Sequence, residues 1–421
     1  MWINKVLARC RSALARHDGS DTGLIRLFLG WNFARAILHN GWWLLASLYM
    51  VVDAGLSPSQ LLVIAAAQGV ASVIFEVPAG VLADTVSRKW AIVVSHALMG
   101  LAMIGTGLFP SFVPLLTCQM LWGIAWTFSS GSDVAWITDE LDQPARMDSV
   151  LTRQARWQML GAGVGMVGLG GLGALAGRPV IIVGAGVAIL VLGGFVALRF
   201  PERNFTPVRT QRWRASISIL RRGAQVAIRD KTILLLVVIT VLVNGAGDSF
   251  GRIYPIRLVD VGLPVGDNGT SWFASVSIGG FITGLLALRA VERRIHNEAG
   301  ARDAMVMAGA AGAVSLLAFG LAPNLAIAVA GVLVVIGVAA PIARTVTTIW
   351  VNRRTPSDVR ATMHSFLAQA EYLGEVGAAG LLAATAGITG ANGAYVLTAV
   401  LFALSAIVAL AAGRDRTNDP S

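Results

Sequence analysis

Apolar stretches of about 20 residues recur about twelve times along this chain, and no other feature constrains its fold as strongly. A helix of that length crosses roughly 30 Å of hydrocarbon, where only helices and closed barrels satisfy their own backbone hydrogen bonds. The composition agrees, because 55% of the 421 residues are hydrophobic and 13% are charged. The sequence therefore predicts an all-α polytopic membrane protein. The runs begin near Leu24, Gln60, Trp90, Phe112, Thr152, Pro179, Thr232, Thr270, Arg302, Asn324, Ala361 and Ala391.

A long polar connection, from Arg199 to Lys231, divides the runs into two groups of six. We expect a basic arm at 1–23, a six-helix bundle at 24–200, a basic linker at 201–231, a second six-helix bundle at 232–413, and a tail at 414–421. The arm lacks an apolar run with a cleavage site, so it does not have the pattern of a signal peptide. Within the linker, Trp213 to Ile228 could form an amphipathic helix on anionic lipid.

Arginine and lysine are concentrated in alternate connections between the runs. The basic set comprises Arg88 and Lys89, Arg146, the linker, Arg293 and Arg294, Arg353 and Arg354, and Arg414 and Arg416. The other set carries only Arg178 and Arg257. By the positive-inside rule, we expect the basic connections and both termini to face the cytoplasm of a bacterial inner membrane. The same pattern explains the net charge of +10, so we expect no nucleic-acid partner.

The two groups of runs resemble each other in short segments. Val52–Leu56, after the first run, matches Val259–Leu263 after the seventh, and the basic pair Arg88 and Lys89 recurs as Arg293 and Arg294. These matches fall in the same order at nearly the same offset, as a duplicated six-helix unit requires.

A charged turn between the second and third runs carries the most specific motif, with Gly80, Asp84, Arg88 and Lys89 in characteristic positions. With this turn and the repeat, the chain resembles the major facilitator superfamily, and within it the drug-exporter-like branch of drug:proton antiporters. The resemblance implies a cytoplasmic gate in which Asp84 docks on the partially positive N-terminus of the eleventh helix. A plain cytoplasmic turn explains the basic pair equally well, but it does not call for Asp84.

Polar and aromatic residues also recur at helical spacing on the first and fourth runs of each group. These stripes are Asn32, Arg35, His39 and Trp42; Gln119, Trp122, Trp126, Ser129 and Asp133; Asn244, Asp248 and Arg252; and Pro341, Arg344 and Thr348. A charge in hydrocarbon costs roughly 2.5 to 3.5 kcal/mol, so the stripes should face one another or water. They predict a central substrate cavity, and the resembled family lines its cavity with the same four helices.

Simpler interpretations of these stripes stay open. Asp248 and Arg252 lie one turn apart and could neutralise each other. The charges of Arg35, Asp133 and Arg344 could form a structural cluster. The tryptophans, among them Trp42, Trp122 and Trp126, could be interfacial anchors.

Coupling to protons requires a carboxylate that is buried enough to exchange a proton near neutral pH. The candidates are Asp133, Asp248, Glu76, and Glu371 together with Glu375, and Glu371 is the second choice after Asp133. Asp133 is favoured because it shares a face with aromatic residues and has Arg35 or Arg344 as a possible charge partner. Gln119 stands where the resembled family usually has an arginine, which puts the family's relay chemistry at that position in doubt.

The sequence and the resemblance together predict a monomeric secondary active transporter for proton-coupled efflux of a hydrophobic or amphipathic small molecule. Alternatives are an importer or facilitator of a small organic solute, or a non-transporting membrane receptor. No glycine frame surrounds the lysines and no histidine pair has helical zinc-site spacing, so we expect no enzyme activity, no cofactor and no metal.

Overall fold

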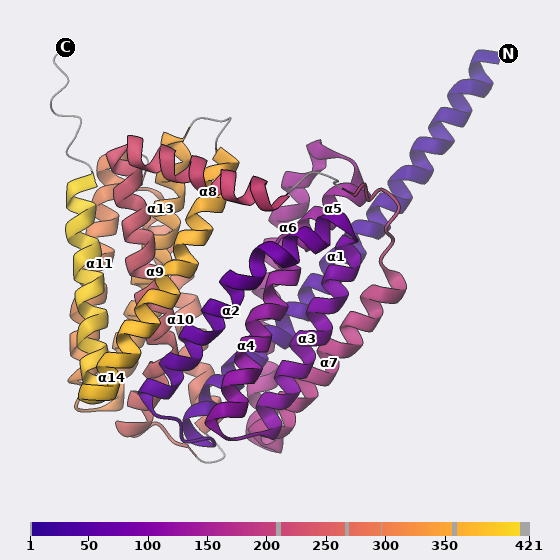
Figure 1. Cartoon of the computed structure of the whole chain (residues 1–421). Helices are drawn as coiled ribbons and strands as arrows, with labels where there is room; N and C mark the ends of the chain where they lie inside the picture. The colour runs from indigo at the N-terminus through magenta and orange to yellow at the C-terminus, as the bar shows by residue number, and fades with distance from the viewer. Residues whose placement is uncertain (1, 208–211, 266–268, 296, 356–359, 413–421) are drawn as a thin grey trace, which may run out of the picture.

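The computed structural model describes the backbone of residues 2–412 except 208–211, 266–268, 296 and 356–359, and the side chains of 2–20, 144–145, 212–220, 360–362 and 365 are likewise outside the description. The described chain is helical and has no strand (Figure 1). Its elements are α1 (Trp2–Val52), α2 (Pro58–Thr85), α3 (Arg88–Leu108), α4 (Phe112–Ser129), α5 (Ser132–Leu141), α6 (Pro144–Ala176), α7 (Arg178–Arg199), α8 (Arg212–Arg229), α9 (Lys231–Asp260), α10 (Gly269–Glu292), α11 (Glu298–Gly320), α12 (Leu325–Val334), the π-helix η1 (Val335–Ala339), α13 (Ala340–Arg354) and α14 (Arg360–Ala412).

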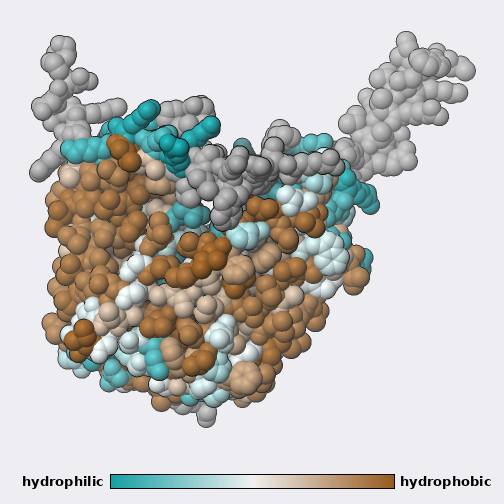
Figure 2. Space-filling model, in the orientation of Figure 1, coloured by the Kyte–Doolittle hydropathy of each residue, from teal (hydrophilic) through white to brown (hydrophobic). Residues whose placement is uncertain are grey.

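Ten segments of the described chain are long and apolar enough to cross a membrane. Their outer surface forms an apolar region with polar residues gathered toward the ends (Figure 2). Leu175, Leu198 and Ile388 are each 86% exposed on this surface, which is stable only against lipid. The molecule is therefore a multi-pass membrane protein.

The predicted runs from Ala361 and Ala391 lie together in α14. This segment consists of two helices joined at Gly390, whose φ of 73° and ψ of −170° are accessible to glycine but not to other residues. The pair counts once among the ten segments, and α1 is not among them. Twelve separate spans remain a prediction from the sequence.

Two other runs are interrupted. The fourth run divides at Gly131, whose φ of 75° ends α4 and starts α5 in a new direction. The tenth run contains η1, which ends at Ala339, two residues before Pro341. Proline lacks the amide hydrogen that would bond the preceding turn, and the wider π-turn accommodates this loss.

The helices α1–α7, here the first set, pack mainly against one another, and α9–α14, the second set, do the same. Within the first set, α1 and α6 approach closely through glycines. A Cβ on Gly165 would lie 2.2 Å from the Ile37 carbonyl oxygen, and one on Gly161 would lie 2.7 Å from that of Phe33. The glycine-rich face of α6 thus permits close helix packing.

The linker helix α8 lies at one end of the molecule, here the linker end, together with the start of α1 and the end of α14 (Figure 1). The opposite end is the far end. There the repeated segments after α1 and α9 form turns, with positive φ at Gly55 (59°) and Gly262 (102°). In the first turn the Leu56 amide donates to the Met50 carbonyl, and in the second the Leu263 amide donates to that of Leu258. The sequence repeat therefore corresponds to similar turns.

Candidate substrate cavity

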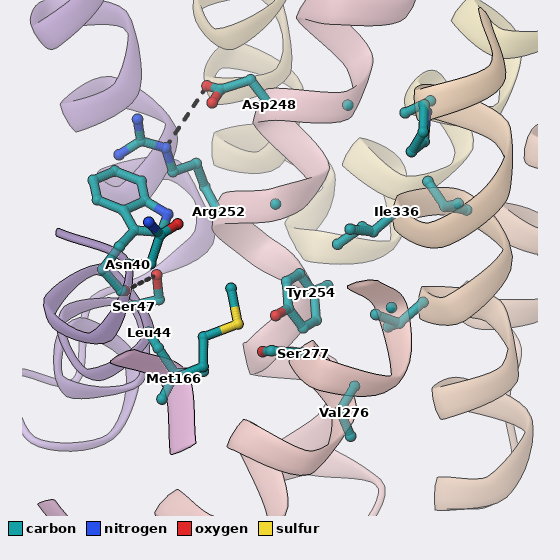
Figure 3. Close-up of a pocket in the computed structure, with 18 of the residues that line it drawn as sticks. Asn40, Leu44, Ser47, Met166, Asp248, Arg252, Tyr254, Val276, Ser277 and Ile336 are labelled. Carbon is teal, nitrogen blue, oxygen red and sulfur yellow. Dashed lines mark hydrogen bonds and ion pairs between the residues drawn. The ribbon is translucent and has the colours of Figure 1, made fainter. Parts of the chain in front are cut away.

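A cavity with two connected lobes lies between the two sets of helices. The apolar lobe has a volume of about 490 Å³ and the aromatic lobe about 540 Å³. Both lobes are lined by six shared residues: Asn40, Trp43, Asp248, Arg252, Arg344 and Glu375. Four of these six carry charge, so the junction of the lobes is the most polar part of the cavity. Figure 3 shows the apolar lobe, with side chains of α1 on one side and those of α9, α10 and η1 opposite.

The apolar lobe extends from this junction toward the far end. Tyr254 and Phe273 stack there with ring centroids 5.6 Å apart. The side chains of Met166, Val276 and Ile336 complete an apolar lining. Figure 3 shows Met166, Tyr254 and Ile336 pointing into the same space. Such a lobe would bury the hydrocarbon body of a ligand.

The aromatic lobe is walled by rings from α1 and α4. Trp122 and Trp126 stack with centroids 5.7 Å apart, and the His39 ring lies 5.3 Å and 5.4 Å from them. His39 Nδ1 and Trp122 Nε1 are buried without a hydrogen-bond partner among the described residues. Buried polar atoms are nearly always paired in folded proteins, so these two indicate a site that is incomplete without a ligand or water.

Arg252 reaches from α9 to the α1 side of the junction (Figure 3). Its guanidinium carbon lies 4.5 Å from the centroid of the Trp43 ring, and its Nη2 donates to Gln68 Oε1 at 3.1 Å. The nearest carboxylate oxygen, on Asp248, is 3.7 Å from Nε, which is too long for a hydrogen bond. Arg252 is only 8% exposed, and its Nε and Nη1 are buried without a hydrogen-bond partner in the described structure.

Arg344 lies opposite, on α13, and its side chain is exposed to the cavity. Its Nε donates to Asn244 Oδ1 at 2.7 Å. Within the described part of the chain, no carboxylate oxygen lies within 4.0 Å of its guanidinium. A cation at this position in a membrane protein is costly, and such groups usually mark a substrate or ion path.

Glu371 and Glu375 are half-buried one turn apart on α14, and both line the aromatic lobe. Among described residues, neither accepts a hydrogen bond or forms an ion pair within 4.0 Å. Two ionised carboxylates at this spacing repel each other, and the repulsion is relieved when either takes up a proton.

The favoured proton carrier of the sequence, Asp133, lies elsewhere. The break at Gly131 turns α5 away from the α4 stripe, and Asp133 Oδ2 accepts from Arg35 Nη1 at 3.4 Å. Arg35 also donates to Ser129 and lies 5.3 Å from the Trp126 ring centroid. This ion pair is buried behind Trp122 and Trp126, which form the tryptophan wall of the aromatic lobe, and neither member of the pair lines a lobe.

The structure brings seven of the stripe residues to the lobes: His39, Trp122, Trp126, Asp248, Arg252, Pro341 and Arg344. Asn244 and Thr348 line a small crevice beside Arg344. Asn32, Trp42 and Gln119 are buried inside the first set, as is the Arg35 pair. Asn32 accepts from Gln154 and Gln158 of α6, and Gln119 donates to Thr106 of α3. These bonds account for the burial of Asn32 and of the Gln119 amide nitrogen, whereas Gln119 Oε1 and Trp42 Nε1 are buried without a partner among the described residues.

Several lining residues were missed as site residues by sequence reasoning, among them Asn40, Trp43, Gln68, Tyr254 and Phe273. Asn40 and Trp43 show that the cavity face of α1 is rotated by about one residue from the predicted stripe. Gln68 is polar within an otherwise apolar run of α2, and this isolated amide was the available signal. Tyr254 and Phe273 carried none, because an aromatic residue in an apolar run indicates nothing about a cavity.

The predicted gate turn is held by its own set. Arg88 forms an ion pair with Asp84 at 3.5 Å and another with Asp139 of α5, and the Lys89 amide donates to Glu202. Gly80 has open space around its Cβ position. The predicted docking of Asp84 on the eleventh helix falls on residues 356–362, which lie outside the described side chains.

The remaining proton candidate, Glu76, lies on α2 outside both lobes, and its Oε2 is buried without a hydrogen-bond partner in the described structure. No group of three or more histidine, cysteine, aspartate or glutamate side chains among the described residues could hold a metal ion.

Comparison with known proteins identifies the family. The sequence pattern of the Major Facilitator Superfamily matches residues 32–379, which is most of the chain and includes both sets of helices. The chain belongs to the major facilitator superfamily. The members of this superfamily are transporters, and the chain is therefore a transporter rather than an enzyme. Comparison with curated protein sequences gives no match.

Solved structures of other transporters share the fold of this superfamily member. The nucleoside transporter NupG superposes with a TM-score of 0.75 at 14% identity, covering 93% of this chain and 100% of that one. A bacterial homologue of the human lysosomal transporter Spinster gives 0.68 at 16% identity, covering 94% and 97%. A D-xylose–proton symporter gives 0.67 at 13% identity, covering 91% and 97%. The superpositions show a shared fold. At identities this low, they give no information about the substrate of this chain.

Proposed function

We propose that this chain is a proton-coupled secondary transporter that moves an amphipathic small molecule by alternating access. The observation that carries the proposal is the two-lobed cavity between the two sets of helices. Its charged junction suits a polar group, and its apolar and aromatic walls suit a hydrocarbon or ring system. A site at the interface of two repeats becomes accessible from either side when the sets rock against each other.

The linker end is proposed to face the cytoplasm. It carries α8 and the turn from Gly80 to Lys89, and the positive-inside rule places such basic connections in the cytoplasm. The turn is then part of the cytoplasmic gate, and the basic side chains of α8 would meet anionic lipid headgroups at the membrane surface.

Glu371 and Glu375 are proposed as the proton carriers. They line the cavity, so a proton can reach them by the route that the substrate uses, and they have no fixed partner among the described residues. Asp248 shares the cavity but lies beside Arg252, and the charge of Asp133 is offset by Arg35. Glu76 is the further candidate, because its carboxylate is partly buried without a partner among the described residues.

The direction of transport has two candidates. Resemblance to the drug-exporter branch favours efflux, in which a proton displaces the substrate. Uptake is favoured by one specific feature, Arg344, which lies beside the glutamate pair and has no ion-pair partner among the described residues. Protonation of the pair leaves this cation without competing anions, so protons and an anionic substrate would bind together and move together.

The test is flux in liposomes that contain the purified chain and carry an imposed proton gradient. We expect gradient-dependent movement of a lipophilic probe, lost in the Glu371→Gln, Glu375→Gln double variant and retained in the control Asp303→Asn. Asp303 is an exposed carboxylate near the linker end that pairs with its neighbour Arg302. Absence of gradient-dependent flux for lipophilic cations, anions and neutral compounds alike would refute the proposal.

A further inference from the structure

We propose that the substrate carries an acidic group, and that Arg344 and Arg252 bind this group at the junction of the two lobes. The inference rests on the proposed transport function and specifies the chemistry of what is transported. It begins from the two guanidinium groups, which have more hydrogen-bond donors than the described structure uses.

Arg344 supplies the first unused donors. A guanidinium has five N–H groups, and the Nε–H of Arg344 donates to Asn244. The two terminal nitrogens make no hydrogen bond to a described residue, and the side chain is exposed to both lobes. The bond to Asn244 orients the planar group, which leaves its outer edge available for two parallel bonds to a carboxylate, sulfonate or phosphate.

Arg252 supplies further unused hydrogen-bond donors. Its one hydrogen bond, to Gln68, uses one of five donors, and Nε and Nη1 are buried without partners in the described structure. Leaving buried donors of a charged group unpaired costs at least about 1 to 3 kcal/mol. If the Arg252 side chain rotates slightly toward Arg344, an acid group at the junction can accept hydrogen bonds from these donors. Those bonds would recover part of the cost of leaving the donors unpaired.

The aromatic residues argue against a cationic substrate at the same place. A cation would bind best over a tryptophan face. The Trp43 ring already carries Arg252 at 4.5 Å, and the Trp126 ring carries Arg35 at 5.3 Å. An incoming cation would have to displace a guanidinium from either ring or approach it as a like charge.

The body of the substrate then extends into a lobe. With its acid group at the junction, a ring or chain can enter the apolar lobe against Tyr254, Phe273 and Ile336, which bury hydrocarbon without offering charge. The substrate class is therefore an amphipathic organic acid small enough to fit a lobe of about 490 Å³.

The carboxylates of the cavity set the relation to protons. The ionisable groups that line the lobes with Arg344 are His39, Asp248, Arg252, Tyr254, Glu371, Tyr372 and Glu375. Of the acidic ones, Glu371 also shares the small crevice with Arg344. Ionised Glu371 competes with the substrate for this guanidinium, and its neutralisation should strengthen binding of the acid.

The experiment measures binding of three radiolabelled probes to the full chain in lipid nanodiscs. The probes are naphthylacetate, naphthylacetamide and naphthylethylamine, which share a ring system and differ in charge. We expect the acid to bind about 10-fold or more tightly than the amide, a difference of about 1.4 kcal/mol, and the amine to bind most weakly. Equal affinities, tighter binding of the amine, or no binding of the acid at about 1 mM would overturn the inference.

Variants assign the preference to the proposed residues. Arg344→Gln should remove the preference for the acid and weaken binding of the amide much less than binding of the acid, and retained binding of the amide also shows that the variant is folded. Arg344→Lys should restore part of the preference, and Arg252→Gln should reduce it. Glu371→Gln should have the opposite effect and bind the acid more tightly. The matched control is Arg302→Gln, because Arg302 lies outside the cavity and pairs with Asp303.

The proposal of an acidic substrate and the proposal of proton-coupled transport can be refuted independently. If the amine or amide is transported under a proton gradient and the acid is neither bound nor moved, the transporter proposal stands and the acidic substrate is refuted. If the acid binds in an Arg344-dependent way without gradient-driven flux of any probe, the recognition stands and proton coupling is refuted. An acid preference that survives Arg344→Gln and Arg252→Gln would also refute the proposed site.

Discussion

A single hydrogen bond at the far end of the molecule offers a measurable test of alternating access. Arg178, at the start of α7, holds Asp53 with contacts of 2.6 Å and 3.1 Å, and its Nη1 donates to Thr270 of α10 at 3.2 Å. The pair with Asp53 lies within the first set, whereas the bond to Thr270 joins the two sets. Opening the far end must break the bond to Thr270 and can leave the ion pair intact.

The perturbation is Thr270→Val, which removes the hydroxyl group and preserves the shape of the side chain. A hydrogen bond to a charged group contributes about 1.5 to 3 kcal/mol, and the length of this bond favours the low end. A loss of about 1.4 kcal/mol multiplies the population of the state open at the far end by about 10. Arg178→Gln should produce a similar shift, because the additional pair that it removes does not cross between the sets.

The assay is the distance distribution between two spin labels, one at Phe109 in the first set and one at Leu321 in the second, both exposed at the far end. We expect the longer distances to gain population in Thr270→Val, and the double variant with Arg178→Gln to shift no further. The control is Ser275→Ala, since this hydroxyl group bonds within its own helix. An unchanged distribution in both single variants would refute the role of the bond, and fully additive shifts would refute the assignment to one contact.

Three further variants test packing, charge burial and backbone conformation, each by thermal unfolding in detergent. Gly165→Ala should destabilise the protein by about 1 to 3 kcal/mol because its Cβ would overlap the backbone of α1, whereas Gly163→Ala, with open space, should not; equal effects would contradict the close packing. Asp133→Asn should lower the free energy of unfolding by about 3 to 5 kcal/mol, because Arg35 is left buried without its carboxylate partner. Adding Arg35→Gln should restore much of this stability, and no recovery in the double variant would contradict a structural ion pair. Gly131→Ala should cost about 1 kcal/mol through its left-handed φ, and an unchanged melting temperature would contradict the break there.

The site was predictable where a polar residue had no alternative partner. Asp248, Arg252 and Arg344 are charged, lie in apolar runs, and belong to stripes that reach the cavity. Asn32 and Gln119 follow the same spacing, yet α6 and α3 supply their hydrogen-bond partners inside the first set. Periodicity identifies a polar face and does not identify the helix that this face meets.

The interruption of the fourth run shows the same limit. The spacing from Gln119 to Asp133 assumes one continuous helix, and a glycine within an apolar run is compatible with either a helix or a break. Gly131 adopts a positive φ at the point where Arg35 bonds both the end of α4, through Ser129, and the start of α5, through Asp133. That arrangement depends on α1, about 100 residues earlier in the chain.

The sequence by itself determined that the protein is helical and spans a membrane several times. The bilayer imposes the same requirement on every span, so length and hydropathy are sufficient evidence. The tertiary structure alone decided that Asp133 pairs with Arg35 while Arg344 stays without an ion-pair partner among the described residues. The physical reason is that the energy of a buried charge depends on groups within a few ångströms in space, and residues distant in sequence supply those groups.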